Sequence, residues 1–139
     1  MKFIPVNRPL ITKSDLINVS KTIKSGWISS SGEEIVNFEK KFSKYVGHKF
    51  GIAVANGTAA LDIAVKLANF KKNDEIIIPN FTIISNALPA IKDKLNIKIV
   101  DCDTYDWNLN LEKLKEKITK KTKVIIATHI YNFPCRIDI

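Results

Sequence analysis

The spacing of apolar residues divides the chain into two parts with different periodicity. In the first 49 residues, apolar side chains recur every three or four positions, which is typical of helices with one buried face. A first helix is expected between a capping sequence at residues 12–15 and Gly26, and a second one ends near Gly47. Residues 1–49 are therefore interpreted as an N-terminal helical segment.

From residue 50 onward, short apolar runs alternate with helical periodicity. The expected strands are residues 50–55, 75–79, 97–101 and 123–128, and the expected helices are residues 58–70, 84–92 and 111–118. Strands that alternate with helices favour right-handed crossovers, so we predict an α/β fold with a mostly parallel sheet and flanking helices. The tail from His129 follows a strand without a closing helix, so residues 1–139 are expected to form a single incomplete domain, with 50–139 as its βα part.

Composition excludes several classes of protein. The 139 residues are 45% hydrophobic and 26% charged, which fits one ordinary globular domain. No apolar run approaches the ~20 residues that cross a membrane, and the first residues lack the apolar core of a signal peptide. Two cysteines, Cys102 and Cys135, give neither a disulfide framework nor a paired zinc motif. We expect a cytoplasmic protein that binds neither a membrane nor a metal.

The net charge of +8 does not by itself indicate a nucleic-acid partner. All but two of the 22 basic residues are lysine, and they are scattered along the chain. Proteins that read nucleic acids use clustered arginine for contacts with phosphate and guanine. We therefore expect a solvated basic surface and no nucleic acid.

The clearest chemical motif is the turn Asn56-Gly57-Thr58, between an expected strand and an expected helix. Gly57 lets the backbone approach a ligand closely, the helix start offers free N–H groups, and Thr58 adds a hydroxyl donor. These donors suit a phosphate or a carboxylate. Simple N-capping of the helix is the alternative. The chain lacks both G-x-G-x-x-G and a P-loop, so dinucleotide and NTP binding are disfavoured.

Other polar groups are expected at the same edge of the sheet. Ligands of parallel α/β sheets bind beyond the carboxyl ends of the strands. The turn at Thr58, the loop 79–85 with Ile83, and the residues His129 and Tyr131 should therefore share one rim. For His129 alone, a structural role is the alternative.

Several segments in a fixed order resemble a known family. They are Gly26-Trp27-Ile28-Ser29-Ser30, Phe38-Glu39, Tyr45-Val46-Gly47, residues 56–61, residues 74–82, Val100-Asp101 and His129-Ile130-Tyr131. Together they resemble the front part of a DegT/DnrJ/StrS-type sugar aminotransferase, a pyridoxal-phosphate (PLP) enzyme. The resemblance implies the N-terminal part of a fold-type I large domain and a homodimer in the full-length family. Members transfer an amino group, usually from glutamate, to a keto-sugar nucleotide for surface glycans or amino sugars.

The resemblance also implies roles for individual residues. Gly57 and Thr58 match positions that hold the PLP phosphate. Ile83 stands where the family usually places an aromatic ring that stacks on the pyridine, and isoleucine keeps the packing but loses the contact between rings. The positions implied on the substrate side are Ser29, His129 and Tyr131.

In the family, the Schiff-base lysine and the carboxylate that faces the pyridine nitrogen lie downstream of the His-x-Tyr motif. Residues 1–139 contain neither, so we expect no catalytic residue in them, no transaminase activity from them alone, and weakened or lost PLP binding. Two alternatives stay open. One is a keto-sugar dehydratase on the same scaffold, in which a histidine replaces the lysine, and the other is a non-catalytic binding or dimerisation module.

Overall fold

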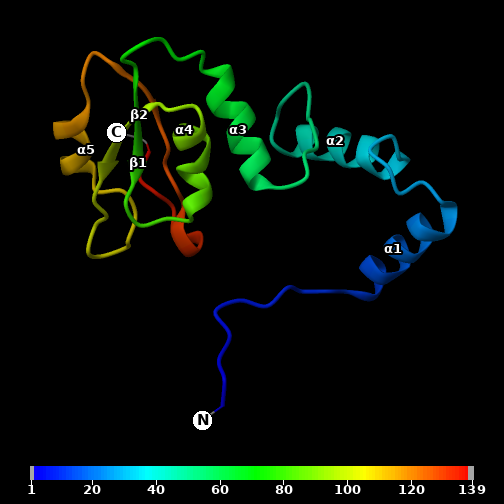
Figure 1. Cartoon of the computed structure of the whole chain (residues 1–139). Coiled ribbons are helices and arrows are strands. Elements are labelled where there is room, and N and C mark those ends of the chain that lie inside the picture. The colour runs from blue at the N-terminus through cyan, green and yellow to red at the C-terminus, as the bar shows by residue number, and fades with distance from the viewer. Residues whose placement is uncertain (1, 138–139) are drawn as a thin grey trace. The chain divides into compact units, whose positions relative to one another are not determined.

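The computed structural model describes residues 2–137. The chain divides into two compact units, Met1–Ala53 and Val54–Ile139 (Figure 1). The first unit is helical and the second contains the sheet. Within the described range, no helix combines the length and the apolar character that a membrane crossing requires.

The first unit contains the two helices that the periodicity predicts, α1 (Lys13–Ser25) and α2 (Glu33–Tyr45). The cap of α1 is a reciprocal pair, in which the Asp15 N–H donates to Thr12 Oγ1 at 3.3 Å and the Thr12 N–H donates to the Asp15 carboxylate at 2.7 Å. Gly26 ends α1 with a φ of +75°, a left-handed conformation that glycine adopts without strain. The predicted start and end of this helix are confirmed.

The second unit is a three-stranded parallel sheet flanked by helices. Its elements are α3 (Gly57–Leu67), β1 (Glu75–Pro79), the 3₁₀ turn η1 (Ile84–Asn86), α4 (Leu88–Lys92), β2 (Asn96–Val100), α5 (Leu111–Lys117), β3 (Thr122–Ile125) and the 3₁₀ turn η2 (Ile130–Asn132). The strand order is β2-β1-β3, and both pairs are parallel. The predicted α/β fold is confirmed.

The core lies on both faces of β1, because successive side chains of a strand point to opposite faces. One buried cluster joins β1 to α3 and α4 and contains Val65, Ile76, Ile78 and Ala90. The cluster on the other face contains Ile77, Val100, Leu109 and Cys135, with Leu114 of α5 packed against it. The sheet is thus covered on both faces, as parallel sheets require.

The strand expected at residues 50–55 is not formed, and that prediction is wrong. Phe50 is 77% exposed and Ile52 is 82% exposed. A strand needs a hydrogen-bonding neighbour, and no described strand pairs with this segment. The Ala53 N–H bonds instead to the Glu39 carboxylate at 2.8 Å, so the segment is extended chain held by a side chain.

Other expected elements are shorter than the periodicity suggested, among them the helix expected at residues 58–70, which ends at Leu67. The helix expected at residues 84–92 is split into η1 and α4, and Pro89 lies in the first turn of α4, where its missing N–H is tolerated. The strand expected at residues 123–128 ends at Ile125. The Ile126 N–H still donates to the Ile77 carbonyl at 2.9 Å, and residues 127–128 follow at the carboxyl edge of the sheet.

Candidate functional site

The N-terminus of α3 lies beside the loop that follows β1. The Asn56 side chain accepts the Ala59 N–H at 2.9 Å, and the Asn56 carbonyl accepts the Ala60 N–H at 3.2 Å. Within residues 2–137, no acceptor takes the N–H groups of Gly57 and Thr58. These two donors lie at the end of the helix that carries partial positive charge, which attracts an anion.

Gly57 has no structural reason to be glycine. Its φ lies outside the left-handed region, and a Cβ built at this position would meet nothing within 4 Å. Open space therefore lies beside the free N–H groups, on the side that a methyl group would fill. A ligand oxygen can approach the backbone there.

A hydrogen bond ties the start of α3 to η1. The Thr58 hydroxyl donates to Ser85 Oγ at 2.9 Å. Ile83 precedes Ser85 by two positions and is 65% exposed, so its side chain is available to a ligand. Thr58 and Ile83 thus lie at the same edge of the sheet, as the topology predicted.

A second group of polar side chains ties the loop after β1 to the segment after β3. Asn86 donates to Thr82 Oγ1 and to Thr128 Oγ1, both at 2.7 Å, and the two hydroxyls are 3.2 Å apart. Sequence reasoning included Ser85 only as the end of the loop 79–85 and did not single out Asn86 or Thr128. The signal that marks the first two is a pair of polar residues inside an otherwise apolar run at residues 83–91.

His129 and Tyr131 follow β3 and are both exposed. His129 Nδ1 accepts the Cys135 N–H at 2.9 Å, which leaves Nε2 for another partner. Tyr131 lies in η2 with a φ of +47°. Burial raises the pKa of the Cys135 thiol, which keeps this side chain in its neutral, apolar form. Within the described residues, no hydrogen bond joins His129 or Tyr131 to Thr58 or to Ser85.

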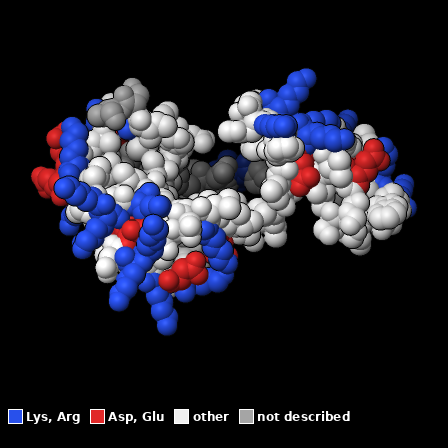
Figure 2. Space-filling model, turned by 90° about the horizontal axis from the view of Figure 1, so that it is seen from above, with Lys and Arg blue, Asp and Glu red and all other residues white. Residues whose placement is uncertain are grey.

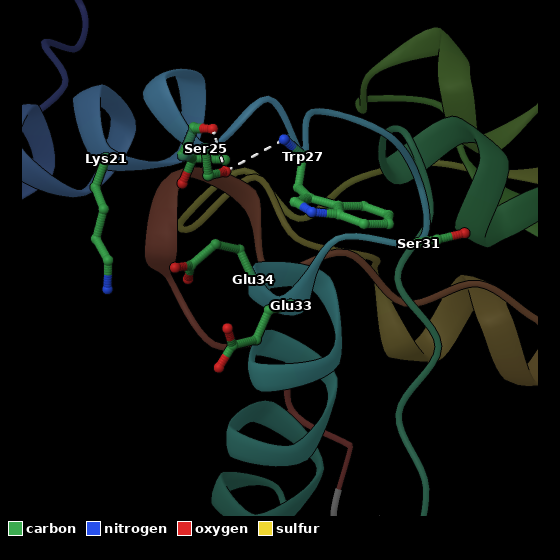
Figure 3. A pocket seen from close by; sticks show the side chains of 7 residues that line it. Lys21, Ser25, Trp27, Ser31, Glu33 and Glu34 are labelled. Atoms are coloured by element: carbon green, nitrogen blue, oxygen red, sulfur yellow. Dashed lines mark hydrogen bonds between the residues drawn. The ribbon is translucent and has the colours of Figure 1, made fainter.

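Ser29 belongs to the first unit, in the loop between α1 and α2. Its hydroxyl accepts the Ser31 N–H at 3.4 Å, and its side chain is exposed. The same loop borders a cavity of about 330 Å³, which Figure 3 shows with Trp27 and Glu34 on its wall. The Trp27 N–H donates to Ser25 Oγ at 3.2 Å and so fixes the backbone at the rim of this cavity.

Two carboxylates near the candidate site are neutralised by lysine. Asp62 of α3 borders the same hollow as Thr58, and its Oδ2 lies 3.0 Å from Lys92 Nζ. Asp101, just after β2, accepts a hydrogen bond from Asn80 at 2.7 Å and pairs with Lys113. In both cases, the lysine holds the pKa of the carboxyl below its ordinary value. Neither carboxylate is therefore placed to repel an anion strongly or to act as a base.

The basic surface is distributed. On the face shown in Figure 2, Lys and Arg side chains are spread over the molecule with acidic side chains between them. On this face, basic side chains outnumber acidic ones, as the net charge of +8 requires of the chain as a whole.

Comparisons with known proteins agree with the fold and with the motifs. The model of the DegT/DnrJ/EryC1/StrS aminotransferase family matches residues 9–139. The GDP-perosamine synthase of Escherichia coli O157:H7 is 37% identical over 139 residues, which cover 99% of this chain and 38% of that protein. The chain thus spans little more than a third of the length of the curated relatives it matches.

Solved structures also match this chain over most of its length. The aminotransferase from Psychrobacter cryohalolentis superposes with a TM-score of 0.84 at 29% identity, over 94% of this chain and 33% of that one. The E. coli GDP-4-keto-6-deoxy-D-mannose-3-dehydratase with bound hydrated PLP gives a TM-score of 0.86 at 26% identity, over 96% of this chain and 36% of that one. Because the family model covers nearly the whole sequence, the chain belongs to the DegT/DnrJ/EryC1/StrS aminotransferase family.

Proposed function

We propose that this chain forms part of a PLP-dependent sugar-nucleotide aminotransferase and carries the part of its site that holds the cofactor phosphate. The observation that carries the proposal is the open N-terminus of α3. Two free N–H groups lie beside a glycine that no internal packing requires. Because the chain belongs to an aminotransferase family and is similar to a GDP-perosamine synthase, we take the anion to be the phosphate of PLP.

The residues present fit PLP. The N–H groups of Gly57 and Thr58 supply donors for a phosphate group, which helix N-termini bind well. The exposed side chain of Ile83 offers an aliphatic surface for the face of the pyridine ring. When bound, PLP supplies an electron sink through which an amino group is exchanged. The chain's own residues hold and orient it.

The substrates follow from the relatives. We propose a keto-sugar nucleotide as amino acceptor and glutamate as donor, in a pathway for surface polysaccharide or amino sugars, because GDP-perosamine synthases and a spore coat polysaccharide biosynthesis protein are among the relatives. Ser29, His129 and Tyr131 are proposed on the substrate side, and His129 keeps Nε2 for this purpose. A cytoplasmic homodimer is proposed for the full-length enzyme on the basis of its family.

The binding site is tested by NMR titration of the 139-residue chain with inorganic phosphate and with pyridoxamine 5′-phosphate, which has no aldehyde to react with surface lysines. The amide signals of Gly57, Thr58 and Ala59 should shift in both titrations. A few charge-assisted hydrogen bonds, each worth about 1.5–3 kcal/mol, less the cost of association, give millimolar affinity. Unmoved signals in a folded sample would show that the turn only caps the helix.

A dehydratase is the second candidate, because the E. coli GDP-4-keto-6-deoxy-D-mannose-3-dehydratase superposes as well as the Psychrobacter aminotransferase does, with TM-scores of 0.86 and 0.84. Reading the gene downstream of codon 139 separates the candidates. A lysine at the cofactor-linking position supports the aminotransferase, and a histidine there supports the dehydratase. A stop codon at that point would support a binding or dimerisation module instead.

A further inference from the structure

The loop at residues 130–135, which follows β3, has a strained backbone. Tyr131 and Asn132 have φ angles of +47° and +67°, in the left-handed region that a residue with a β-carbon disfavours. Such residues persist only where the surrounding structure holds them in place. The loop therefore needs bonds from neighbouring parts of the chain to keep this conformation.

Asn108 supplies one set of these bonds. It is 3% exposed, and its Oδ1 accepts the Ile130 N–H at 3.2 Å. Its Nδ2 donates to the carbonyls of Phe133 and Pro134 at 3.2 and 3.3 Å. All three partners are backbone groups of fixed polarity, so they set the orientation of the amide. An amide does not titrate near neutral pH, so these bonds do not depend on pH.

His129 supplies a further bond, to the last residue of the loop. Its Nδ1 accepts the Cys135 N–H at 2.9 Å. A backbone N–H only donates, so Nδ1 must carry a lone pair, and the neutral ring holds its hydrogen on Nε2. Cys135 is 4% exposed and packs in the core cluster with Ile77 and Val100. The bond thus seats the end of the strained loop against the sheet.

We propose that the bond between His129 and Cys135 is a pH-sensitive latch, which holds the loop 130–135 closed while the ring is neutral and releases it when the ring is protonated. In the protonated ring both nitrogens carry hydrogens, so Nδ1 no longer accepts. The contact becomes repulsive, and a buried donor loses its acceptor. The closed loop is therefore favoured at high pH and lost as the pH falls. This inference goes beyond the proposed function and does not depend on it.

The other charged and titratable groups around the latch do not produce this response. They are Asp106 in the loop after β2, Lys115 of α5, and Tyr131, Cys135 and Arg136 on the segment of the latch itself. The Asn108 N–H donates to the Asp106 carboxylate at 2.9 Å and holds its pKa below the ordinary value, so Asp106 stays ionised. Burial raises the pKa of the Cys135 thiol, which stays neutral. Among ordinary side chains, only histidine changes its charge between pH 5 and pH 8.

NMR of the 139-residue chain from pH 8 to pH 5 tests the latch in the wild type. The amide signal of Cys135 should move toward the position of an amide without a hydrogen bond, with the same midpoint as the ring signals of His129. The amide signals of β1 should not follow that midpoint. A Cys135 signal that stays fixed, or that follows another midpoint, would overturn the proposal. Movement of the β1 signals with His129 would also overturn it, because that result indicates unfolding of the sheet.

His129→Asn tests the titrating group. The Asn Oδ1 lies two bonds from Cβ, as Nδ1 does, so it can accept the Cys135 N–H without titrating. Opening of the loop is measured by the reaction of the Cys135 thiol with dithiodipyridine, relative to the chain unfolded in urea at the same pH. Peptide mapping separates this thiol from Cys102. Between pH 8 and pH 5, protection should fall about 5- to 150-fold in the wild type, the value of one buried donor left without a partner, and stay unchanged in His129→Asn.

His48→Asn is the matched control, because His48 is the other histidine of the chain and lies in the first unit. This variant should keep the wild-type response to pH. His129→Ala has no acceptor and should show low protection at both pH values. Equal responses in the wild type and His129→Asn would overturn the proposal, and so would high protection at both pH values in His129→Ala. If a variant does not fold, the wild-type titration decides.

Discussion

Replacing Gly57 with alanine should stabilise the second unit. Gly57 is the first residue of α3, outside the left-handed region, and a Cβ there meets nothing within 4 Å. A Gly→Ala change at such a position restricts the unfolded chain without straining the folded one, which adds about 0.4–1 kcal/mol to the free energy of unfolding. For a unit of this size, that gain raises the thermal midpoint by about 2–8 °C.

The same methyl group should weaken phosphate binding. It fills the open space beside the free N–H groups of Gly57 and Thr58, where the ligand oxygen is proposed to approach. Losing one charge-assisted hydrogen bond costs about 1.5–3 kcal/mol, or roughly 10- to 100-fold in affinity. Gly57→Val adds a larger, branched side chain and should abolish binding. Stability and binding are thus predicted to change in opposite directions.

Thermal unfolding followed by circular dichroism, together with phosphate titration by NMR, measures both effects. Gly26→Ala is a matched control, because its Cβ also meets nothing within 4 Å but its φ is +75°. That variant should lower the stability of the first unit and leave phosphate affinity unchanged. A Gly57→Ala variant that is more stable yet binds phosphate normally would refute the assignment of the open space to a ligand. A less stable one would refute the packing argument.

Three further predictions concern the core, the pH response and the reaction. The side chain of Ile77 is 0% exposed, so Ile77→Ala should lower the free energy of unfolding in urea by about 2–5 kcal/mol. The control Ile99→Ala, at a residue of β2 that is 62% exposed, should change it by no more than about 0.5 kcal/mol. Equal effects would contradict the described core. Lys113 lowers the pKa of Asp101 below 3.8, so this carboxylate stabilises the fold near neutral pH, and its contribution is lost as the pH falls through its lowered pKa. Asp101→Asn should therefore flatten the decline of the thermal midpoint in acid, and an unchanged decline would show that the ion pair contributes nothing. Finally, the 139-residue chain incubated with glutamate, PLP and a keto-sugar nucleotide should release no 2-oxoglutarate above a blank, and any turnover would show that one of its own lysines links the cofactor.

Features set by local chemistry could be predicted from the sequence. The Thr12 cap and the Gly26 terminus of α1 depend on residues a few positions apart, and both are present. The apolar run of β1 forms the buried central strand, since a continuous apolar segment needs cover on both faces. The neighbourhood of Thr58 and the loop after β1 was predicted correctly, although the strand expected before Thr58 is not formed.

Features that depend on distant partners could not be predicted. The segment 50–55 has the composition of a strand, but composition does not say whether a neighbouring edge is free, and within the described residues none pairs with it. The Asn86–Thr128 bond joins residues 42 positions apart, which no local pattern records. The sequence therefore predicted which segments lie at the carboxyl edge of the sheet, but it did not predict the hydrogen bonds between their side chains.

The position of β1 between its two neighbours has a consequence for biosynthesis. β1 is made first, but its partners Asn96–Val100 and Thr122–Ile125 emerge only later. At about 5–20 residues per second, the nascent chain carries three consecutive isoleucines without a completed sheet for several seconds. Such a β-branched segment is prone to intermolecular pairing while it is uncovered. Translation speed and chaperone supply should therefore govern the soluble yield of this chain more strongly than its final stability does.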